Sequence, residues 1–230
     1  MKDALLIPFS IIIAGILIGG GLYMSKNSGD IEEKTIDEAI KQASNMEAID
    51  PNDHLLGNPS ARVIIVEYSD TECPFCKEFH KTLRAIMTEY GTNGDMSWIY
   101  RHLPIAELHS KAPKEAEALE CAGELGGNAK FWEYTNRIYE ITPSNNNLPA
   151  SELTNVAKQV GLSSEKFNAC LESGKYATKV KSDVDDAFKA GAEGTPFSII
   201  IDTKNGDTYP VNGAYPYSQL KNIIDLILQS

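Results

Sequence analysis

The sequence predicts an α/β domain with an inserted helical region, preceded by one N-terminal transmembrane helix. Three observations support this fold class. Residues 4–24 carry no charge, residues 62–68 form a short run rich in β-branched side chains, and residues 109–190 follow a nearly unbroken helical pattern between predicted strands. With 230 residues, of which 42% are hydrophobic and 23% charged, the chain is long enough for one globular domain and an appendage.

The overall charge is negative, with 21 Lys and Arg residues against 32 Asp and Glu residues and a formal net charge of -11. Binding to nucleic acid depends largely on basic side chains that neutralise the phosphates. The acidic balance therefore argues against a nucleic-acid partner.

The uncharged run of residues 4–24 determines the expected compartment. At 1.5 Å per residue, the run spans roughly 30 Å, the thickness of the hydrocarbon core of a bilayer. The alternative is a cleaved secretory signal. Such a signal has a shorter apolar stretch and small residues just before the cut, whereas this run ends Gly19-Gly20-Gly21-Leu22-Tyr23-Met24. We predict a transmembrane signal anchor at residues 1–25. Either way the rest of the chain is exported, and we expect a single-pass protein of the cell membrane with an extracytoplasmic domain.

Residues 26–53 are polar and acidic, with a helix-like pattern at residues 31–46. They are expected to form a tether, or alternatively a short docking helix. The composition changes after this segment, and residues 54–230 are predicted to form the folded domain.

Within this domain, strands and helices follow from the periodicity of the hydrophobic residues. A buried central strand is expected first, and the Asn205-Gly206 pair is a hairpin turn signal between the last two strands. The helical region at 109–190 is interrupted at Gly126-Gly127 and at three further turn signals. The expected strands are 62–68, 96–101, 197–201 and 208–211, and the expected helices outside the helical region are 74–90 and 217–228.

Two of the four cysteines form a motif of sequence Cys73-Pro74-Phe75-Cys76, directly after the central strand and at the start of a helix. In this context a Cys-X-X-Cys pair is typical of a redox site. The free N–H groups and the dipole at a helix N-terminus favour the thiolate of Cys73. Pro74 costs no hydrogen bond at the first helical position. We therefore expect Cys73 to lie at the exposed edge and to attack, and Cys76 to lie one turn further in and to resolve.

The other two cysteines, Cys121 and Cys170, are far apart in sequence. If they pair, closing their loop stabilises the fold by about 4 kcal/mol, against about 2 kcal/mol for the four-residue ring of Cys73 and Cys76. The small ring is then the more easily reduced one. Alternatives for the motif are a structural disulfide or a metal site that also uses His80, four residues after Cys76. We predict no metal.

The motif CPFC after VIIVEYSDTE, and the Thr195-Pro196 step before FSIII with helices between them, resemble the DsbA-like family of thiol:disulfide oxidoreductases. The resemblance covers roughly residues 53–229. It implies a thioredoxin-like fold with an inserted helical domain, which we map to about 109–190.

The resemblance also implies roles for particular residues. Thr195 and Pro196 would face the cysteines and bind substrate across a cis peptide bond. Glu67 would be the acidic residue behind the active site that relays the proton of Cys76; its alternative is a surface position on an edge strand. Cys121 and Cys170 would form a second, structural disulfide between two helices of the insertion.

The expected function is that of a dithiol oxidase, which introduces disulfides into reduced exported client proteins by mixed-disulfide exchange and needs no cofactor. The resemblance implies a quinone-linked membrane protein that reoxidises the site. Members that are strong oxidants often carry His where this chain has Phe75, so we expect a milder oxidant. The absence of a separate dimerisation domain between residues 25 and 53 argues against an isomerase of the dimeric kind, and we expect a monomer. The alternatives are a disulfide isomerase or reductase, and a thiol metal-binding domain that handles copper.

Overall fold

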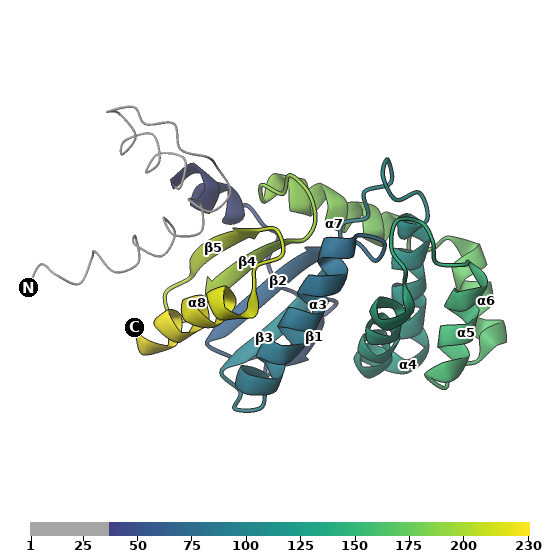
Figure 1. Ribbon diagram of the computed structural model, residues 1–230, viewed down its shortest axis with the longest axis horizontal. Helices are drawn as coiled ribbons and strands as arrows, with labels where there is room; N and C mark the ends of the chain where they lie inside the picture. The colour runs from purple at the N-terminus through teal and green to yellow at the C-terminus, as the bar shows by residue number, and fades with distance from the viewer. Residues whose placement is uncertain (1–36) are drawn as a thin grey trace, which may run out of the picture.

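The computed structural model describes residues 37–230, which contain a five-stranded sheet of order β1-β3-β2-β4-β5 (Figure 1). β2 and β3 run parallel, and all other neighbouring strands run antiparallel. The strands are β1 His54–Gly57, β2 Val63–Ser69, β3 Met96–His102, β4 Phe197–Asp202 and β5 Asp207–Asn212. Four of them were expected within one or two residues. β1 was not, because four residues of sequence HLLG carry no recognisable period.

Helices cover both faces of the sheet, and a further group of helices stands beside it (Figure 1). α3 and α8 pack on one face, and α7 packs on the other. The helices are α3 Pro74–Ile86, continued by the π-helical turn η1 Met87–Gly91, α4 Ala112–Ile141, α5 Ser151–Gln159, α6 Ser164–Ser173, α7 Ala177–Lys189 and α8 Tyr217–Gln229. The expected alternation of strands and helices is confirmed.

The central strand β2 is buried along its whole length, as expected for a strand covered on both sides. Val63 and Ile65 point to the face covered by α3 and α8, whereas Ile64 and Val66 point to the face covered by α7. This alternation explains why the run RVIIVEY is nearly continuous in hydrophobic side chains.

The helical region between β3 and β4 divides into two parts. α4, α5 and α6 pack on one another, and the expected break in α4 is a kink at Gly127, whose φ of 75° favours glycine. α7 instead returns to the sheet, where the buried side chain of Ala187 joins the apolar cluster on the second face. The range 109–190 was expected as one helical insertion. Its last helix, α7, instead covers the second face of the sheet.

The residues expected to form a tether at 26–53 are, in their described part, packed against the domain. Residues 37–43 are helical, and Ala43 is fully buried in the cluster beneath α7. The buried guanidinium of Arg101 donates to Asp53 at 2.8 Å and to the carbonyl of Glu47 at 3.1 Å. A buried cation needs such acceptors, so the segment is fastened and corresponds to the alternative of a docking helix.

The transmembrane anchor predicted for residues 1–25 lies outside the described residues. Between residues 37 and 230, no helix is long and apolar enough to cross a bilayer.

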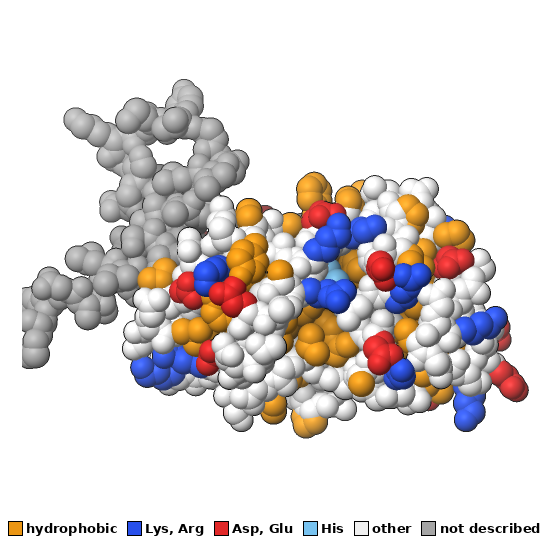
Figure 2. Space-filling model, turned by 60° about the horizontal axis from the view of Figure 1, so that its bottom comes forward, with side chains coloured by type: hydrophobic (Ala, Val, Ile, Leu, Met, Phe, Trp, Pro, Cys, Tyr) orange, Lys and Arg blue, Asp and Glu red, His pale blue; other side chains and the backbone are white. Residues whose placement is uncertain are grey.

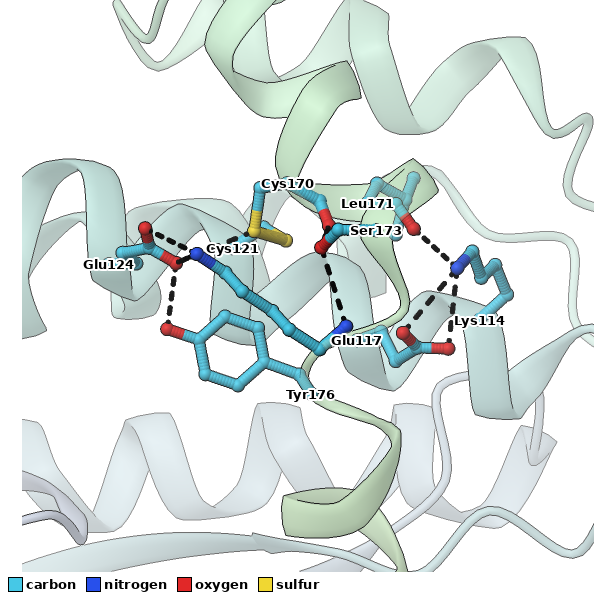
Figure 3. The surroundings of a disulfide bond; sticks show 9 residues. Lys114, Glu117, Cys121, Glu124, Cys170, Leu171, Ser173 and Tyr176 are labelled. Carbon is cyan, nitrogen blue, oxygen red and sulfur yellow. Dashed lines mark hydrogen bonds and ion pairs between the residues drawn. A yellow bond between two sulfur atoms is a disulfide. The ribbon is translucent and has the colours of Figure 1, made fainter.

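A disulfide joins Cys121 of α4 to Cys170 of α6, with a Cα–Cα distance of 5.9 Å (Figure 3). Both cysteines are buried. Glu124 lies beside the bridge and accepts hydrogen bonds from Lys175 Nζ at 2.6 Å and from the Tyr176 hydroxyl at 2.9 Å. The bridge and these contacts fasten the end of α6 to α4.

We expect the double substitution Cys121→Ala and Cys170→Ala to lower the free energy of unfolding by about 4 kcal/mol, because the bridge restricts a long loop in the unfolded chain. Urea denaturation measures the loss. The control is Cys73→Ala with Cys76→Ala, which keeps the bridge and should lose similar stability only when a reductant is added. A loss below about 1 kcal/mol in both experiments would show that the bridge adds little.

Candidate active site

The two cysteines of the motif lie where β2 passes into α3. Cys73 is the residue before the helix, in an extended conformation, and Pro74 takes the first helical position. The carbonyl of Cys73 already accepts the N–H of Lys77 at 3.1 Å, so the helix begins at the motif. Cys73 and Cys76 are free thiols in this structure.

Strand pairing brings the Thr195-Pro196 step to the same place. β2 and β4 are antiparallel neighbours in which Tyr68 lies opposite Phe197. The residues before Phe197 therefore lie beside the residues after Tyr68, where the motif begins. The Thr195-Pro196 peptide bond is cis.

Cys73 lies against Thr195 and is more covered than expected. Its Sγ atom lies 3.6 Å from the Thr195 carbonyl oxygen, and only 5% of the residue is exposed. The expectation of an exposed edge was wrong in degree, because the chain before β4 packs over the start of α3.

The pKa of Cys73 is lowered to about 6. The largest cause is a hydrogen bond from the Cys76 thiol. A hydrogen bond from Thr195 and the backbone N–H groups of Phe75 and Cys76 add to it, whereas burial opposes it. These donors favour the charged form of the sulfur. Cys73 is therefore mostly a thiolate at neutral pH.

The pKa of Cys76 moves in the opposite direction, well above that of a free thiol. Burial is the main cause, since the residue has no exposed surface, and the negative charges of Cys73 and Glu67 contribute. The backbone N–H of Asp70 lies 3.5 Å from Cys76 Sγ. The pair thus consists of a thiolate near the surface and a protonated thiol beneath it.

Glu67 lies inside the fold behind Cys76, so the alternative of an exposed edge position is wrong. It has no exposed surface, and it accepts hydrogen bonds from Ser69 Oγ at 2.7 Å and from Trp98 Nε1 at 3.0 Å. Burial raises the pKa of Glu67 to about 8, although both hydrogen bonds oppose this shift. The carboxyl group is therefore mostly protonated at neutral pH.

A chain of hydroxyl groups continues from Glu67 and was not expected from the sequence. Ser69 Oγ lies 2.8 Å from the hydroxyl of Tyr139, which lies 3.0 Å from the hydroxyl of Tyr100. These tyrosines come from α4 and β3. Tyrosine is intermediate in its tendency to be buried, and no spacing in the sequence connects these two with the motif.

His80 packs inside the fold. Its Nε2 atom lies 2.8 Å from Asn136 Oδ1, and its ring stacks on Tyr139 with centroids 4.3 Å apart. Burial lowers the pKa of His80 to about 4, so the ring is neutral. In the described part of the chain, no group of three or more His, Cys, Asp or Glu residues could hold a metal ion.

Acidic residues surround the turn before the motif, and sequence reasoning missed them. Asp70 Oδ2 lies 2.8 Å from the backbone N of Ile105 and 2.9 Å from Nδ1 of His109. The Thr71 hydroxyl donates to Glu115 at 2.6 Å. Burial raises the pKa of Glu115 to about 8. The hydrogen bond from Thr71 opposes this shift, and a hydrogen bond with Glu72 and the charge of Glu72 add to it. Acidic residues are usually solvated, so their burial could not be inferred from the sequence.

The remaining histidines also have partners that the sequence did not indicate. His102 Nε2 and His54 Nε2 lie 2.8 Å and 3.1 Å from the two oxygens of Glu120. Burial opposes ionisation of this carboxyl group, but the two imidazoles hold its pKa well below the usual range.

The surface near the thiols is partly apolar. Phe75, between the two cysteines, is 66% exposed. Figure 2 shows hydrophobic side chains gathered toward the middle of one face of the molecule. Among the predicted site residues, the structure thus brings together Cys73, Cys76, Thr195 and Pro196, with Glu67 behind them. Cys121 and Cys170 lie apart, in the helical insertion.

The hydrogen bond between the two thiols leads to a test. Alkylation of Cys73 by iodoacetamide should follow a midpoint near pH 6 in the unmodified chain. Cys76→Ala removes the donor and should raise the midpoint by about one pH unit or more, whereas Cys76→Ser keeps a donor and should raise it less. Equal midpoints in the two variants would mean that the bond does not control the ionisation of Cys73.

Comparisons with known proteins agree with this geometry. Residues 49–225 match the family model described as Thioredoxin. The crystal structure of DsbA2 from Pseudomonas aeruginosa is 28% identical, with a TM-score of 0.66 over 80% of this chain and 98% of that chain. BdbD from Bacillus subtilis in its oxidised form is 21% identical, with a TM-score of 0.68 over 77% of this chain and 94% of that chain, and shows the shared fold.

The curated relatives are much longer proteins. The Na(+)/H(+) antiporter NhaA 1 of Salinispora arenicola is 30% identical over 167 residues, which are 72% of this chain and 24% of that protein. The chain thus spans about a quarter of the length of the curated relatives it matches. From the family match over residues 49–225 and the five-stranded sheet with its helical insertion, the chain belongs to the thioredoxin family, with a DsbA-like form of the fold.

Proposed function

We propose that the chain is an extracytoplasmic thiol:disulfide oxidoreductase, and that it acts as a dithiol oxidase through Cys73 and Cys76. The observation that carries this proposal is the opposite ionisation of the two thiols, with Cys73 a thiolate at the start of α3 and Cys76 a buried thiol. Each unit by which the pKa of Cys73 is lowered stabilises the reduced form and makes the disulfide more oxidising by about 30 mV.

The proposed reaction is a two-electron exchange. A client thiolate attacks Cys73 Sγ in the Cys73–Cys76 disulfide, and Cys76 leaves as a thiolate that takes up a proton. A second client thiolate then attacks the client sulfur of the mixed disulfide, and Cys73 leaves. The client is oxidised to a disulfide and the motif is reduced to two thiols. The low pKa of Cys73 supports its role, because a thiol of low pKa is a good leaving group.

Glu67 is proposed to supply the proton that Cys76 takes up. A thiolate at the buried position of Cys76 is unfavourable. Glu67, with its pKa near 8, carries a proton at neutral pH and is close enough for its charge to affect Cys76. The hydrogen bonds from Ser69 and Trp98 hold this carboxyl group in place.

Clients are proposed to bind across Thr195 and Pro196. The Thr195 backbone lies against Cys73, so a client chain bound there would bring its own sulfur close to Cys73. The exposed ring of Phe75 adds apolar surface of the kind that an incompletely folded protein can contact. The proposed partners are thus reduced exported proteins and a quinone-linked membrane protein that reoxidises the motif.

The proposed location is the outer side of the cell membrane. It is supported by the uncharged run of residues 4–24 in the sequence and by the Cys121–Cys170 disulfide, since such bonds persist in oxidising compartments. Residues 1–25 are proposed as the anchor and 54–230 as the catalytic domain. Resistance of the full chain to extraction from membranes at alkaline pH, with accessibility to added protease in spheroplasts, tests both points.

Oxidative refolding of a reduced test protein, run beside insulin reduction, tests the proposed activity. The oxidised chain should form disulfides in the test protein faster than it reduces insulin. Cys76→Ala should accumulate client mixed disulfides through Cys73, and Cys73→Ala should lose activity at least about a hundredfold. Efficient insulin reduction and a potential near that of thioredoxin, about -270 mV, would identify a reductase instead.

The role of Glu67 has its own test. Glu67→Gln keeps an acceptor for Trp98 but cannot release a proton, so refolding at pH 7 should slow on the order of tenfold to a hundredfold. The unmodified chain should also lose activity as the pH rises through about 8 and Glu67 ionises, and the variant should not show this step. The alkylation midpoint of Cys73 controls for damage to the site and should change little. An unchanged rate and pH profile would exclude the relay.

A further inference from the structure

Glu72, the residue directly before Cys73, has an unusual set of contacts. Its side chain has no exposed surface, and no Lys, Arg or His among residues 37–230 forms an ion pair with it. Instead, one carboxylate oxygen accepts the backbone N–H of Asn146 at 2.7 Å, and the other accepts that of Leu148 at 3.3 Å. Its main-chain carbonyl accepts the N–H of Asn145 at 2.8 Å. One residue of the active-site turn thus binds three backbone groups of another loop.

The loop that Glu72 binds connects α4 to α5 and has an unfavourable backbone. Three consecutive residues other than glycine lie in the left-handed region, namely Ser144 at φ 66°, Asn145 at 57° and Asn146 at 63°. Such a conformation is costly for residues with a Cβ atom and persists only where other contacts hold it. The hydrogen bonds to Glu72 are contacts of this kind.

The turn that carries Glu72 is itself hydrogen-bonded to the backbone of Cys73 and lies against the sulfur of Cys76. The N–H of Glu72 donates to Asp70 Oδ1 at 2.8 Å, and the N–H of Cys73 donates to the Asp70 carbonyl at 3.1 Å. The N–H of Asp70 lies 3.5 Å from Cys76 Sγ. A displacement of Glu72 would therefore shift the backbone that bonds to the Cys73 N–H and contacts Cys76 Sγ.

We propose that Glu72 is a positioning residue: its buried carboxylate holds the loop 144–148 of the helical insertion against the active-site turn and so keeps Cys73 in hydrogen-bonding range of Cys76 and Thr195. This inference rests on the proposed function and deepens it. It makes the reactivity of Cys73 depend on how the insertion is seated. The acidic side chain acts by accepting backbone N–H groups, and its charge by itself would disfavour the Cys73 thiolate.

This opposition between geometry and charge gives a sharp experiment. Glu72→Ala removes the acceptors, and the alkylation midpoint of Cys73 should rise by about one pH unit, with roughly fivefold less thiolate at pH 6. Glu72→Gln keeps one acceptor oxygen without the charge and should raise the midpoint less. Glu107→Ala removes the charge of an exposed side chain and should leave the midpoint unchanged. A lower midpoint in both Glu72 variants would show an effect of charge alone and overturn the proposal.

A rescue variant separates positioning from a general loss of stability and covers the case in which Glu72→Ala folds poorly. Asn145→Gly relieves the left-handed strain at an exposed position. Combined with Glu72→Ala, it should make the loop resistant to proteolysis again and return the Cys73 midpoint at least halfway. Restored proteolytic resistance without any return of the midpoint would mean that Glu72 only stabilises the loop, and would overturn the proposal.

Failure of this inference is distinguishable from failure of the proposed function. If the unmodified chain oxidises reduced proteins and its Cys73 midpoint is near pH 6, but Glu72→Ala retains that midpoint, only the role of Glu72 is rejected. If the unmodified chain has neither property, the oxidase proposal itself is rejected.

Discussion

The Cys76 thiol donates a hydrogen bond to the sulfur of Cys73. This contact lowers the pKa of Cys73 and raises the pKa of Cys76. The surrounding fold is what makes the contact possible. β2 delivers the turn, α3 begins at Pro74 with its free N–H groups near Cys73, and the pairing of β2 with β4 places Thr195 on the other side. Because Cys76 is fully buried, it keeps its proton and can serve as the donor.

Much of the fold could be predicted from local patterns. The β-branched run at 62–68 predicts a buried strand, and the hydrophobic period after Pro74 predicts a helix with one buried face. The Asn205-Gly206 turn predicts the last hairpin. The positions of Cys73 and Cys76 followed from the same reasoning, since a strand followed by a helix N-terminus is a local feature. The Thr195-Pro196 site could be predicted only from a family resemblance. Thr195 is 122 positions from Cys73 in the sequence, and no local pattern connects the two.

The features that could not be predicted depend on burial of charged groups by distant segments. By local rules, Glu72 in a turn and Glu115 in a helix should both be exposed to solvent. Glu72 is buried because the loop 144–148 packs over it, and Glu115 is buried because α4 packs against the turn at Thr71. Arg101 likewise reads as the end of a strand. Only the folded chain brings Asp53 and Asp186 to it and thereby fastens the segment that the sequence suggested was a tether.

The location of the second disulfide in the helical insertion has a consequence for an enzyme of this chemistry. A protein whose thiolate attacks disulfides is at risk of rearranging its own bonds, since exchange requires only that the attacking sulfur reach the bridge. Cys121 and Cys170 lie between α4 and α6, apart from the motif, with Glu124 and Tyr176 placed around them (Figure 3). The motif disulfide can therefore exchange with other proteins while the second disulfide stays out of reach of Cys73 in the same molecule, so that repeated turnover leaves the fold intact.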